Sequence, residues 1–406
     1  MALDDRLRDD ASALAPDLIR LRHTLHAHPE IGLDLPVTQE TVLAAIDGLG
    51  LEITTGQGLS SVTAVLRGSR PGPAVLLRGD MDALPVSEDT GLDFASRVDG
   101  AMHACGHDLH TAMLVGAARL LAAHRAELPG DVVFMFQPGE EGWDGAGLML
   151  NEGVLEAAGK RVSSAYGMHV MSSMIPRSVF ATRPGPLMAA SGALAVTVRG
   201  RGGHGSAPHR GRDPVTAAAE MVTALQTLVT RRFDVFDPVV VTVGWLHAGT
   251  RRNIIPDEAR FEATVRSFSA EAHDRIKAEA PALCRQIGAA FGVEVDAEYT
   301  EEYPVTSNNP EHAQFAADVV AETFGAGRYQ QLPNPITGSE DFSRVLAEVP
   351  GCYLFLGAHT ETGTGGPDNH SPRAAFDDSV IADGVLLHAQ LALRALRRDE
   401  AAAGAG

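Results

Sequence analysis

Five short segments of the sequence carry side chains that bind metal ions. A lone histidine is more often a hydrogen-bonded structural residue than a ligand, and a pair of adjacent glutamates usually lies in a solvated turn, so each segment is a weak signal alone. Together they offer carboxylates, imidazoles and one thiol, which suit zinc or a similar divalent ion. The segments are Asp80-Met-Asp82, His103-Ala-Cys-Gly-His-Asp108, Glu140-Glu141, Met168-His169 and Asn369-His370-Ser-Pro372.

Two of these segments favour a metal site over the structural alternative. Cys105 and His107 place a thiol and an imidazole with one residue between them. Glu140 and Glu141 directly follow a strongly apolar run, where two neighbouring charges are hard to solvate without a cation. A structural zinc site is usually closed by several cysteines, and no second cysteine lies near Cys105 in the sequence. The pattern therefore predicts a catalytic metal site.

The elements that must position these ligands alternate between strands and helices. Strands are predicted over Ala74–Arg78, Asp131–Phe136 and Ala165–Val170, each directly before or within a ligand segment. Such alternation indicates an α/β fold with a mostly parallel sheet covered on both faces, in which ligands gather at the carboxyl ends of the strands. Helices are predicted at two places within Leu14–Leu51, over Asp108–His124 and over Ala146–Ala157.

The pattern changes after residue 186 and returns after residue 303. Within this interval the strands and helices are predicted in the order β-α-β-β-α-β, which is the ferredoxin-like arrangement. We therefore expect an inserted domain at 187–303, of about 110 residues, an ordinary size for a domain. The catalytic, metal-binding domain is then discontinuous, at 1–186 and 304–406. The predicted elements of the insertion are Ala193–Arg199, Pro214–Arg231, Val239–His247, Glu258–Ser267, Ala270–Phe291 and Glu294–Tyr303.

Composition and charge narrow the function. Asp and Glu outnumber Lys and Arg by 52 to 33, a formal charge of −19, which argues against nucleic-acid binding. No wholly apolar run approaches the ~20 residues of a membrane span, and the acidic N-terminus does not resemble a secretory signal. Three cysteines give no disulfide framework, and Cys284 and Cys352 are expected to be core residues. These features favour a cytoplasmic enzyme.

Several motifs, in the same order from about Arg20 to the end of the chain, resemble the hippurate hydrolase and auxin-conjugate (IAA-amino acid) hydrolase type of amidohydrolase. This type is a branch of the aminoacylase and carboxypeptidase G superfamily of two-metal enzymes. The resemblance implies the same two-domain layout. The motifs are Arg78-Gly-Asp-Met-Asp-Ala-Leu-Pro85, Met102-His-Ala-Cys-Gly-His-Asp-Leu-His110, Phe136-Gln-Pro-Gly-Glu-Glu-Gly142, Gly200-Arg-Gly-Gly-His-Gly-Ser-Ala-Pro-His209, Asn253-Ile-Ile-Pro256 and Asn369-His-Ser-Pro372.

The resemblance implies five metal ligands, which are Cys105, His107, Glu141, His169 and His370. In more distant relatives the bridging ligand is an aspartate and the first histidine comes from a strand end. Here Asp80 occupies that earlier position and Cys105 takes the bridging role. We expect two divalent ions per subunit, manganese or zinc first and cobalt or nickel as alternatives, because a thiolate favours softer ions than magnesium or calcium.

The hypothesis for the mechanism gives each remaining motif a role. Glu140 is expected to be the general base. Asp82 is expected to contact and orient a metal-bound histidine without binding the metal itself. His204, which matches a lid histidine in the relatives, is expected to help neutralise the oxyanion. Its alternative is a turn residue in a glycine-rich loop. Asn253 is expected to position the substrate. His103, Asp108, His110 and His209 are left undecided, and Arg201, Arg210, Arg212, Arg251 and Arg252 are candidates for binding the substrate carboxylate.

The expected function is metal-dependent hydrolysis of the amide bond of an N-acyl amino acid, hippurate-like or N-acetylated. The alternatives with the same centre are an N-acetyl-diaminopimelate deacetylase and a dipeptidase. The alternatives of another class are a cysteine-nucleophile hydrolase built on Cys105 and a non-catalytic binding protein. The expected partners are the small substrate and a second copy of the chain, since the lid histidine of relatives often reaches across a dimer interface. Neither nucleic acid nor membrane is expected to bind.

Overall fold

The computed structural model describes residues 3–360 and 365–404. Two compact units make up the chain. The first unit comprises Met1–Leu187, Ser307–Asn334 and Asp341–Gly406, and the second comprises Met188–Thr306 and Pro335–Glu340. The chain passes between them within β7 (Gly185–Met188) and β14 (Thr306–Asn308), and again on either side of Pro335–Glu340.

An eight-stranded, mostly parallel sheet forms the centre of the first unit, with strand order β1-β2-β4-β3-β5-β16-β6-β15. Its central strands β4, β3, β5 and β16 run parallel, whereas β1, β2 and β6 introduce antiparallel pairings. The central strands are buried along their whole length because both faces are covered. The strands are β1 (Glu52–Thr55), β2 (Val62–Leu66), β3 (Ala74–Asp80), β4 (Asp131–Gln137), β5 (Ser164–Met171), β6 (Phe180–Thr182), β15 (Tyr329–Gln331) and β16 (Gly351–Gly357).

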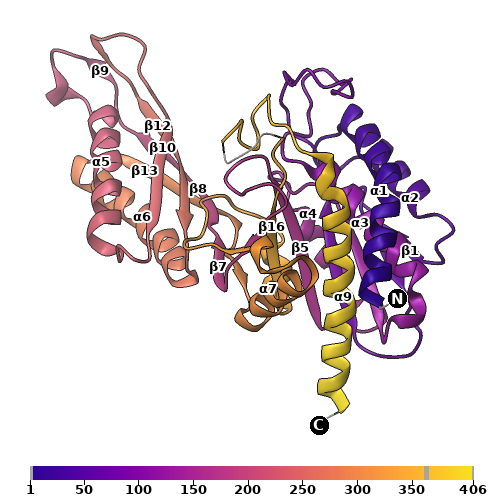
Figure 1. Cartoon of the computed structure of the whole chain (residues 1–406). Coiled ribbons are helices and arrows are strands. Elements are labelled where there is room, and N and C mark those ends of the chain that lie inside the picture. Colours follow the sequence, from indigo (N-terminus) through magenta and orange to yellow (C-terminus); the bar gives the residue numbers. More distant parts are fainter. Residues whose placement is uncertain (1–2, 361–364, 405–406) are drawn as a thin grey trace. The chain divides into compact units, whose positions relative to one another are not determined.

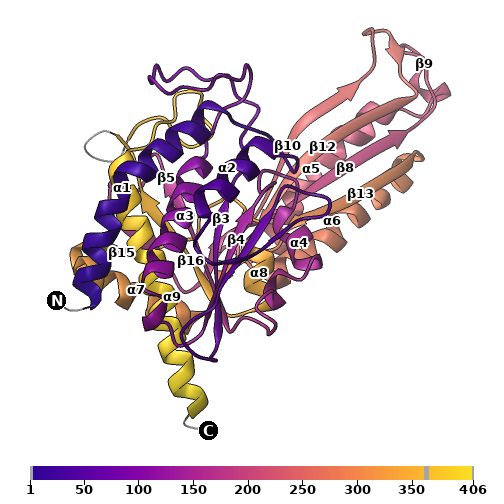
Figure 2. The ribbon, with the colours of Figure 1, turned by 90° about the vertical axis from the view of Figure 1, so that its right-hand side faces the viewer.

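Helices cover both faces of this sheet. On one face α1 (Leu3–Ala27), α3 (His107–Ala123) and α9 (Ile381–Gly404) pack against one another, with α2 (Pro36–Ile46) against α3 and α7 (Pro310–Phe324) against α9. Figure 2 shows α4 (Gly145–Asn151) and α8 (Ser343–Glu348) on the opposite face. The predicted mostly parallel α/β sheet is therefore confirmed.

The segment Asp378–Ala402, which contains most of α9, is long and apolar enough to cross a membrane, with a mean hydropathy of 1.3 over its most apolar window. However, 78% of that window is buried inside the protein. In Figure 1 the helix runs along the first unit, where Val385, Leu387 and Leu391 belong to the hydrophobic core. We therefore interpret α9 as a core helix.

The second unit contains a four-stranded antiparallel sheet in the order β10-β12-β8-β13. Helices α5 (Pro214–Arg232) and α6 (Ala270–Phe291) pack against it and follow the N-cap residues Asp213 and Ser269, which accept hydrogen bonds from main-chain amides. The strands are β8 (Ala190–Arg199), β10 (Val239–Ala248), β12 (Glu258–Ser267) and β13 (Glu294–Tyr303), and a small separate sheet pairs β9 (Gly203–His204) with β11 (Ile254–Ile255). The β-α-β-β-α-β order of the main elements agrees with the sequence prediction.

Two helices differ from their predicted bounds. The helix predicted over Ala146–Ala157 is shorter, because α4 ends at Asn151 and Gly153 then takes a left-handed conformation with φ +84°. The first helix begins at Leu3 rather than at Leu14. The acidic residues Asp4 and Asp5 in its first turn favour this earlier start through the helix dipole.

Candidate metal centre

Cys105 and His107 are separated by a turn that only glycine fits. Gly106 has φ +83°, and a Cβ atom on it would lie 2.4 Å from Cγ2 of Val170 in β5. This close approach brings the Cys105–His107 segment directly against the end of β5, where His169 lies. Helix α3 begins at His107, so the imidazole is fixed at the first residue of a buried helix. The side chains of both Cys105 and His107 are buried.

Glu140 and Glu141 follow β4 and are oriented by an aspartate from the end of β3. The carboxylate of Asp82 accepts hydrogen bonds from the main-chain amides of Glu140 and Glu141, both at 3.0 Å. Oδ1 of Asp82 also lies 3.5 Å from Nδ1 of His107. Asp82 is 1% exposed, so these two amides solvate its charge in place of water. Asp82 thus connects the glutamate pair with His107.

His169 and His370 approach the thiol of Cys105 from two different segments. Nδ1 of His169 lies 2.7 Å from the main-chain oxygen of Val170, which leaves its Nε2 facing Sγ of Cys105 at 3.3 Å. His370 takes a left-handed conformation with φ +72°. Its Nε2 lies 3.3 Å from the same sulfur and 3.1 Å from Oε1 of Glu141.

All five residues predicted as metal ligands therefore gather in two overlapping groups. Cys105, His107 and His169 form one group, and Cys105, Glu141 and His370 form the other. Within each group the ligand atoms lie within 4.8 Å of one another. Because Cys105 belongs to both groups, its sulfur occupies the position that a bridging ligand between two ions would have.

The unsatisfied atoms of this cluster fit a bound cation. Both ring nitrogens of His107 are buried without a hydrogen-bond partner among the described residues, and Oε1 of Glu141 is approached by Nε2 of His370 at 3.1 Å. A buried polar atom left in this state costs about 1–3 kcal/mol, so such atoms in a native protein call for a partner. Two imidazole nitrogens and a carboxylate oxygen beside a thiol are a suitable donor set for zinc, manganese, cobalt or nickel.

The charges of the cluster shift its histidines in opposite directions. Hydrogen bonding to Cys105 and Glu141 raises the pKa of His370 to about 10. Burial, together with the neighbouring His110, lowers the pKa of His169 well below its usual value. Burial also lowers the pKa of His107, but the negative charges of Asp80, Asp82 and Cys105 outweigh it and raise that pKa well above normal. The raised pKa values of His107 and His370 follow from the acidic groups around them, which also favour a bound cation.

Glu140 lies beside the ligands, and its carboxylate oxygen is within 4.8 Å of the ligand atoms of His107 and Glu141. His204 and Asn253 lie in the second unit, where they are neighbours. His204 pairs with Ile254 in the small sheet, and the amide of Gly205 donates to the main-chain oxygen of Asn253 at 2.9 Å. The five candidate arginines lie in the loops on either side of β9 and before β11.

The buried residues that support the strands carrying the proposed ligands were not identified from the sequence. Asp80 is not a free ligand, because it is fully buried and bonds to Arg78 at 2.5 Å and to Nδ1 of His110 at 2.5 Å. Nε2 of His110 in turn accepts the amide of Val170 at 2.8 Å. The undecided His110 is thus a support for β5. The sequence feature that could have revealed this network is Arg78, an arginine near the end of an apolar strand. A buried arginine requires anionic partners.

The undecided Asp108 and His103 belong to a buried cluster between α1 and the start of α3. Asp108 bonds to Nε of Arg22 and to Nδ1 of His26, both at 2.9 Å. His103 lies close to this group, with both ring nitrogens buried, and burial lowers its pKa to about 3. These residues anchor α1 against α3. His209 lies in the short helix Pro208–Arg210 of the second unit.

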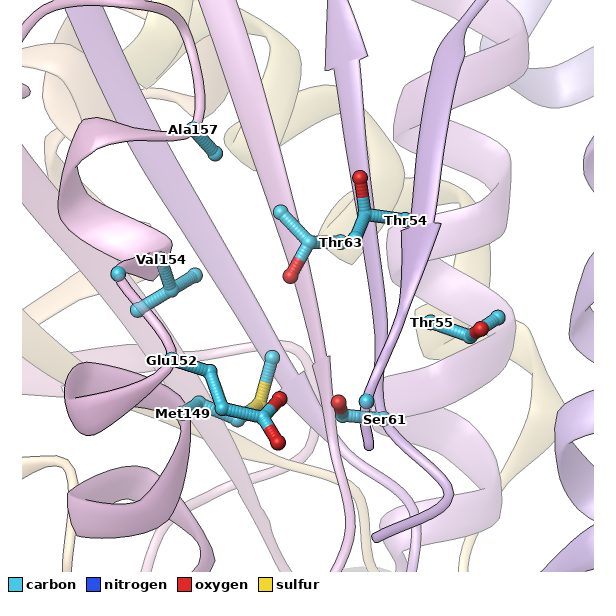
Figure 3. Close-up of a pocket in the computed structure, with 10 residues that line it drawn as sticks. Thr54, Thr55, Ser61, Thr63, Met149, Glu152, Val154 and Ala157 are labelled. Carbon is cyan, nitrogen blue, oxygen red and sulfur yellow. The ribbon is translucent and has the colours of Figure 1, made fainter. Parts of the chain in front are cut away.

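Cavities elsewhere do not include the predicted site. Figure 3 shows a cavity of about 140 Å³ between the β1–β2 hairpin and the segment after α4, where Thr54 and Thr63 face Val154 and Ala157. A second cavity, of about 320 Å³, lies beside α5 in the second unit. Neither is lined by a predicted ligand or catalytic residue.

The chain is similar to known proteins over most of its length. The family model described as peptidase family M20/M25/M40 matches residues 76–394. Thermostable carboxypeptidase 1 of Saccharolobus solfataricus is 38% identical over 97% of this chain and 99% of that protein. Hippurate hydrolase of Campylobacter jejuni is 34% identical over 93% of this chain and 96% of that protein. The crystal structure of a dinuclear metal-binding M20 peptidase from Bacillus subtilis matches with a TM-score of 0.81 and 32% identity, over 95% of this chain and 99% of that one.

These likenesses run over nearly the whole chain, so they concern both units. The resemblance inferred from the motifs is confirmed at the level of the family, whereas the hippurate and auxin-conjugate branch stays a prediction. The family and the hydrolases among these relatives support a metal-dependent amidohydrolase. The chain belongs to peptidase family M20/M25/M40.

Proposed function

We propose that the protein hydrolyses the amide bond of an N-acyl amino acid, using two divalent metal ions bound at Cys105, His107, Glu141, His169 and His370. The observation that carries this proposal is the shared position of Cys105 in two ligand groups. A site with one structural ion has no use for the second group. Manganese or zinc is the proposed metal, with cobalt or nickel as alternatives. Ions bound there would lower the pKa of a water toward ~7 and polarise the amide carbonyl.

Glu140 is proposed as the general base. It stands next to Glu141 and is oriented through the bond between its main-chain amide and Asp82. A carboxylate in this position takes a proton from the attacking water and later gives it to the nitrogen of the leaving amine. The role requires that Glu140 is not itself a ligand, which agrees with the four other side chains that group with Cys105.

His204 is proposed as the donor to the oxyanion, and its own contacts support that role. Nδ1 of His204 accepts the main-chain amide of Ser206 at 3.2 Å, so this nitrogen carries no proton in the neutral ring. The proton is then on Nε2, which is a hydrogen-bond donor. An oxyanion requires such a donor. Asn253, which directly precedes β11 and accepts the amide of Gly205, is proposed to position the substrate.

Exposed apolar side chains next to the ligands support an apolar acyl group. Trp143, two residues after Glu141, is 54% exposed, and its indole lies against Gly32. Ile31 is 39% exposed and forms a bridge with Ala83, the neighbour of Asp82. Exposed large apolar residues beside a site often mark a ligand surface. A benzoyl group, as in hippurate, suits this surface better than an acetyl group, and a hippurate hydrolase is among the relatives.

The domain roles are part of the same proposal. Residues 1–186 and 304–406 form the catalytic domain, and 187–303 form a lid that excludes water from the intermediate and supports a homodimer. Location in the cytoplasm likewise stays a prediction.

The experiment that tests the proposal is hydrolysis of a substrate panel, which contains hippurate, N-acetylated amino acids, an indole-3-acetyl amino acid, N-acetyl-diaminopimelate and a dipeptide. Each is assayed after chelator treatment and again after adding manganese, zinc, cobalt or nickel. We expect hydrolysis to stop with the chelator and to return with metal, fastest with an aromatic acyl group. Activity that survives complete metal removal but is lost with a thiol reagent would support the cysteine-nucleophile alternative instead. Tight binding without turnover would support a binding protein.

A further inference from the structure

Asn369 connects three segments of the metal cluster, although it is not itself a predicted ligand. Its Nδ2 donates to the main-chain oxygen of Cys105 at 3.2 Å and to that of Val170 at 3.1 Å. Its Oδ1 accepts from the main-chain amide of Ser172 at 2.9 Å. The side chain thus joins the turn before α3, the end of β5 and the loop that carries His370.

The donors and acceptors around Asn369 determine the orientation of its side-chain amide. The amide of Ser172 is a donor, so it requires the oxygen of Asn369 rather than its nitrogen. Two carbonyl oxygens then face Nδ2, and carbonyl oxygens only accept. An amide rotated by 180° would lose all three bonds. The orientation therefore follows from three independent partners.

The same nitrogen also faces the sulfur of Cys105. Nδ2 of Asn369 lies 3.7 Å from Sγ, within reach of an N–H···S hydrogen bond. Its two hydrogens are thus spread over three acceptors, which are two carbonyl oxygens and one sulfur. A donor at this distance stabilises a thiolate and withdraws electron density from it, as donors around metal-bound sulfur do.

Asn369 also precedes the left-handed residue His370. A non-glycine residue in this conformation costs about 1–3 kcal/mol and persists only where its surroundings hold it. The main-chain amide of His370 donates to the oxygen of Ala104 at 2.9 Å, and Asn369 holds the next residue, Cys105. The two bonds tie adjacent residues of one segment to adjacent residues of the other. Together they keep Nε2 of His370 pointing at the sulfur.

We propose that Asn369 is a positioning residue of the metal centre. It holds the Cys105 sulfur, the β5 end that carries His169 and the turn that carries His370 at the spacing that lets one thiolate serve both ligand groups, and it tunes that thiolate through the N–H···S contact. This inference rests on the role of Cys105 as a metal ligand in the proposed function.

The test uses Co²⁺ as the probe, because a thiolate bound to cobalt gives a charge-transfer absorption that reports on the sulfur. Metal-free wild type, Asn369→Ala and Asn369→Ser are titrated with Co²⁺ against a competing chelator. We expect Co²⁺ to bind the two variants about 10–100-fold more weakly, the usual effect of removing a group that orients a ligand. We also expect the charge-transfer band to move.

Asn308→Ala is the matched control. Asn308 is a buried asparagine of the same unit that likewise bonds to main-chain and side-chain groups from separate segments, including Tyr353 and Thr182, but it does not contact the cluster. We expect this control to lower the melting temperature while leaving the band and the Co²⁺ affinity unchanged.

Three outcomes would overturn the inference, and they are distinguishable. A folded Asn369→Ser or Asn369→Ala variant with the wild-type band and an affinity within twofold of wild type would reject the role of Asn369 alone. Wild type that binds Co²⁺ without any thiolate band would reject Cys105 as a ligand, and the inference with it. An equal loss of affinity in the Asn308→Ala control would show a general effect of stability and would also reject it.

Discussion

The main-chain amide of Glu140 donates a hydrogen bond of 3.0 Å to Oδ1 of Asp82. The second oxygen of the same carboxylate accepts the next amide, that of Glu141, also at 3.0 Å. A single buried aspartate therefore sets the direction of both the proposed base and a proposed ligand. The contact with Asp82 is made by the main-chain amide of Glu140 and not by its carboxylate. The charge of the carboxylate can therefore be removed by substitution without losing this contact.

We expect Glu140→Gln to lose hydrolysis and keep its metal. Glutamine keeps the main-chain amide that binds Asp82 but cannot take up a proton, and loss of a general base lowers kcat by about 10²–10⁴-fold. Metal content and hydrolysis rate are measured on the same preparation, with Glu152→Gln, an exposed residue near α4, as the control. Normal turnover in Glu140→Gln would remove the assignment. Loss of metal in that variant would make Glu140 a ligand instead.

The location of the ligands could be predicted because it follows from sheet geometry. A buried parallel sheet brings the ends of β3, β4 and β5 to one edge, so Asp82, Glu140 and His169 had to lie near one another. The inserted unit could also be predicted. Strands such as β12 alternate apolar and polar residues in the sequence, which is typical of a sheet with one covered face, and in the structure the apolar residues are the buried ones.

The supporting contacts were not predictable, because they depend on distances across the fold. Arg78 and Asp341 are 263 positions apart and still form a buried ion pair. The role of Asn369 depends on the left-handed turn at His370, and no residue type near it signals this turn. The antiparallel strands β1 and β2 were also missed. The exposed residues of β1 do not show the apolar run that marked the central strands.

Arg78→Met should destabilise the first unit strongly. Arg78 is fully buried between Asp80 and Asp341, so its loss removes the positive charge that it shares with these two carboxylates. Breaking a buried ion pair from one side costs about 3–5 kcal/mol. Denaturant unfolding of Arg78→Met is compared with that of Arg70→Met, which removes an ion pair with Glu400 at the surface. Exposed pairs contribute about 0–1 kcal/mol. Equal effects of the two substitutions would contradict the proposed importance of the buried network.

His26 should make stability depend on pH above neutrality. Burial lowers the pKa of His26, but the carboxylate of Asp108, with help from Glu88, outweighs this effect and raises the pKa from 6.5 to about 9. Since the folded state favours the protonated ring, the stabilisation is complete below pH 6.5 and is lost as the pH rises through about 9. The loss is at most about 3.5 kcal/mol, because one pKa unit corresponds to about 1.4 kcal/mol.

The measurement is the free energy of unfolding of wild type and of His26→Gln across this pH range. The difference between them should shrink toward pH 9. His28→Gln, at the exposed end of the same segment, serves as the control and should parallel wild type at every pH. A difference between wild type and His26→Gln that stays constant from pH 6 to pH 10 would show that His26 does not titrate in this way.

Trp143→Ala should raise KM for hippurate more than for N-acetylglycine. The indole is proposed to pack against the aromatic acyl group, and burying such a ring contributes about 1.5–3 kcal/mol, so a rise of about 10-fold or more is expected. An acetyl group is too small to use this contact. Val240→Ala, which removes an exposed apolar residue from the second unit, is the control and should change neither value. An equal change for both substrates would exclude Trp143 from acyl recognition.

The central claim is that two metal ions share the thiolate of Cys105 and are required for hydrolysis. The most direct measurement is titration of the metal-free protein with Zn²⁺ or Mn²⁺, in which bound metal per chain and hydrolysis of hippurate are followed together, for wild type and for Cys105→Ala. Wild type is predicted to bind two ions per chain and to become active as they bind, and Cys105→Ala to bind them more weakly and stay inactive. Hydrolysis by metal-free wild type, or full activity with a single bound ion, would contradict the claim.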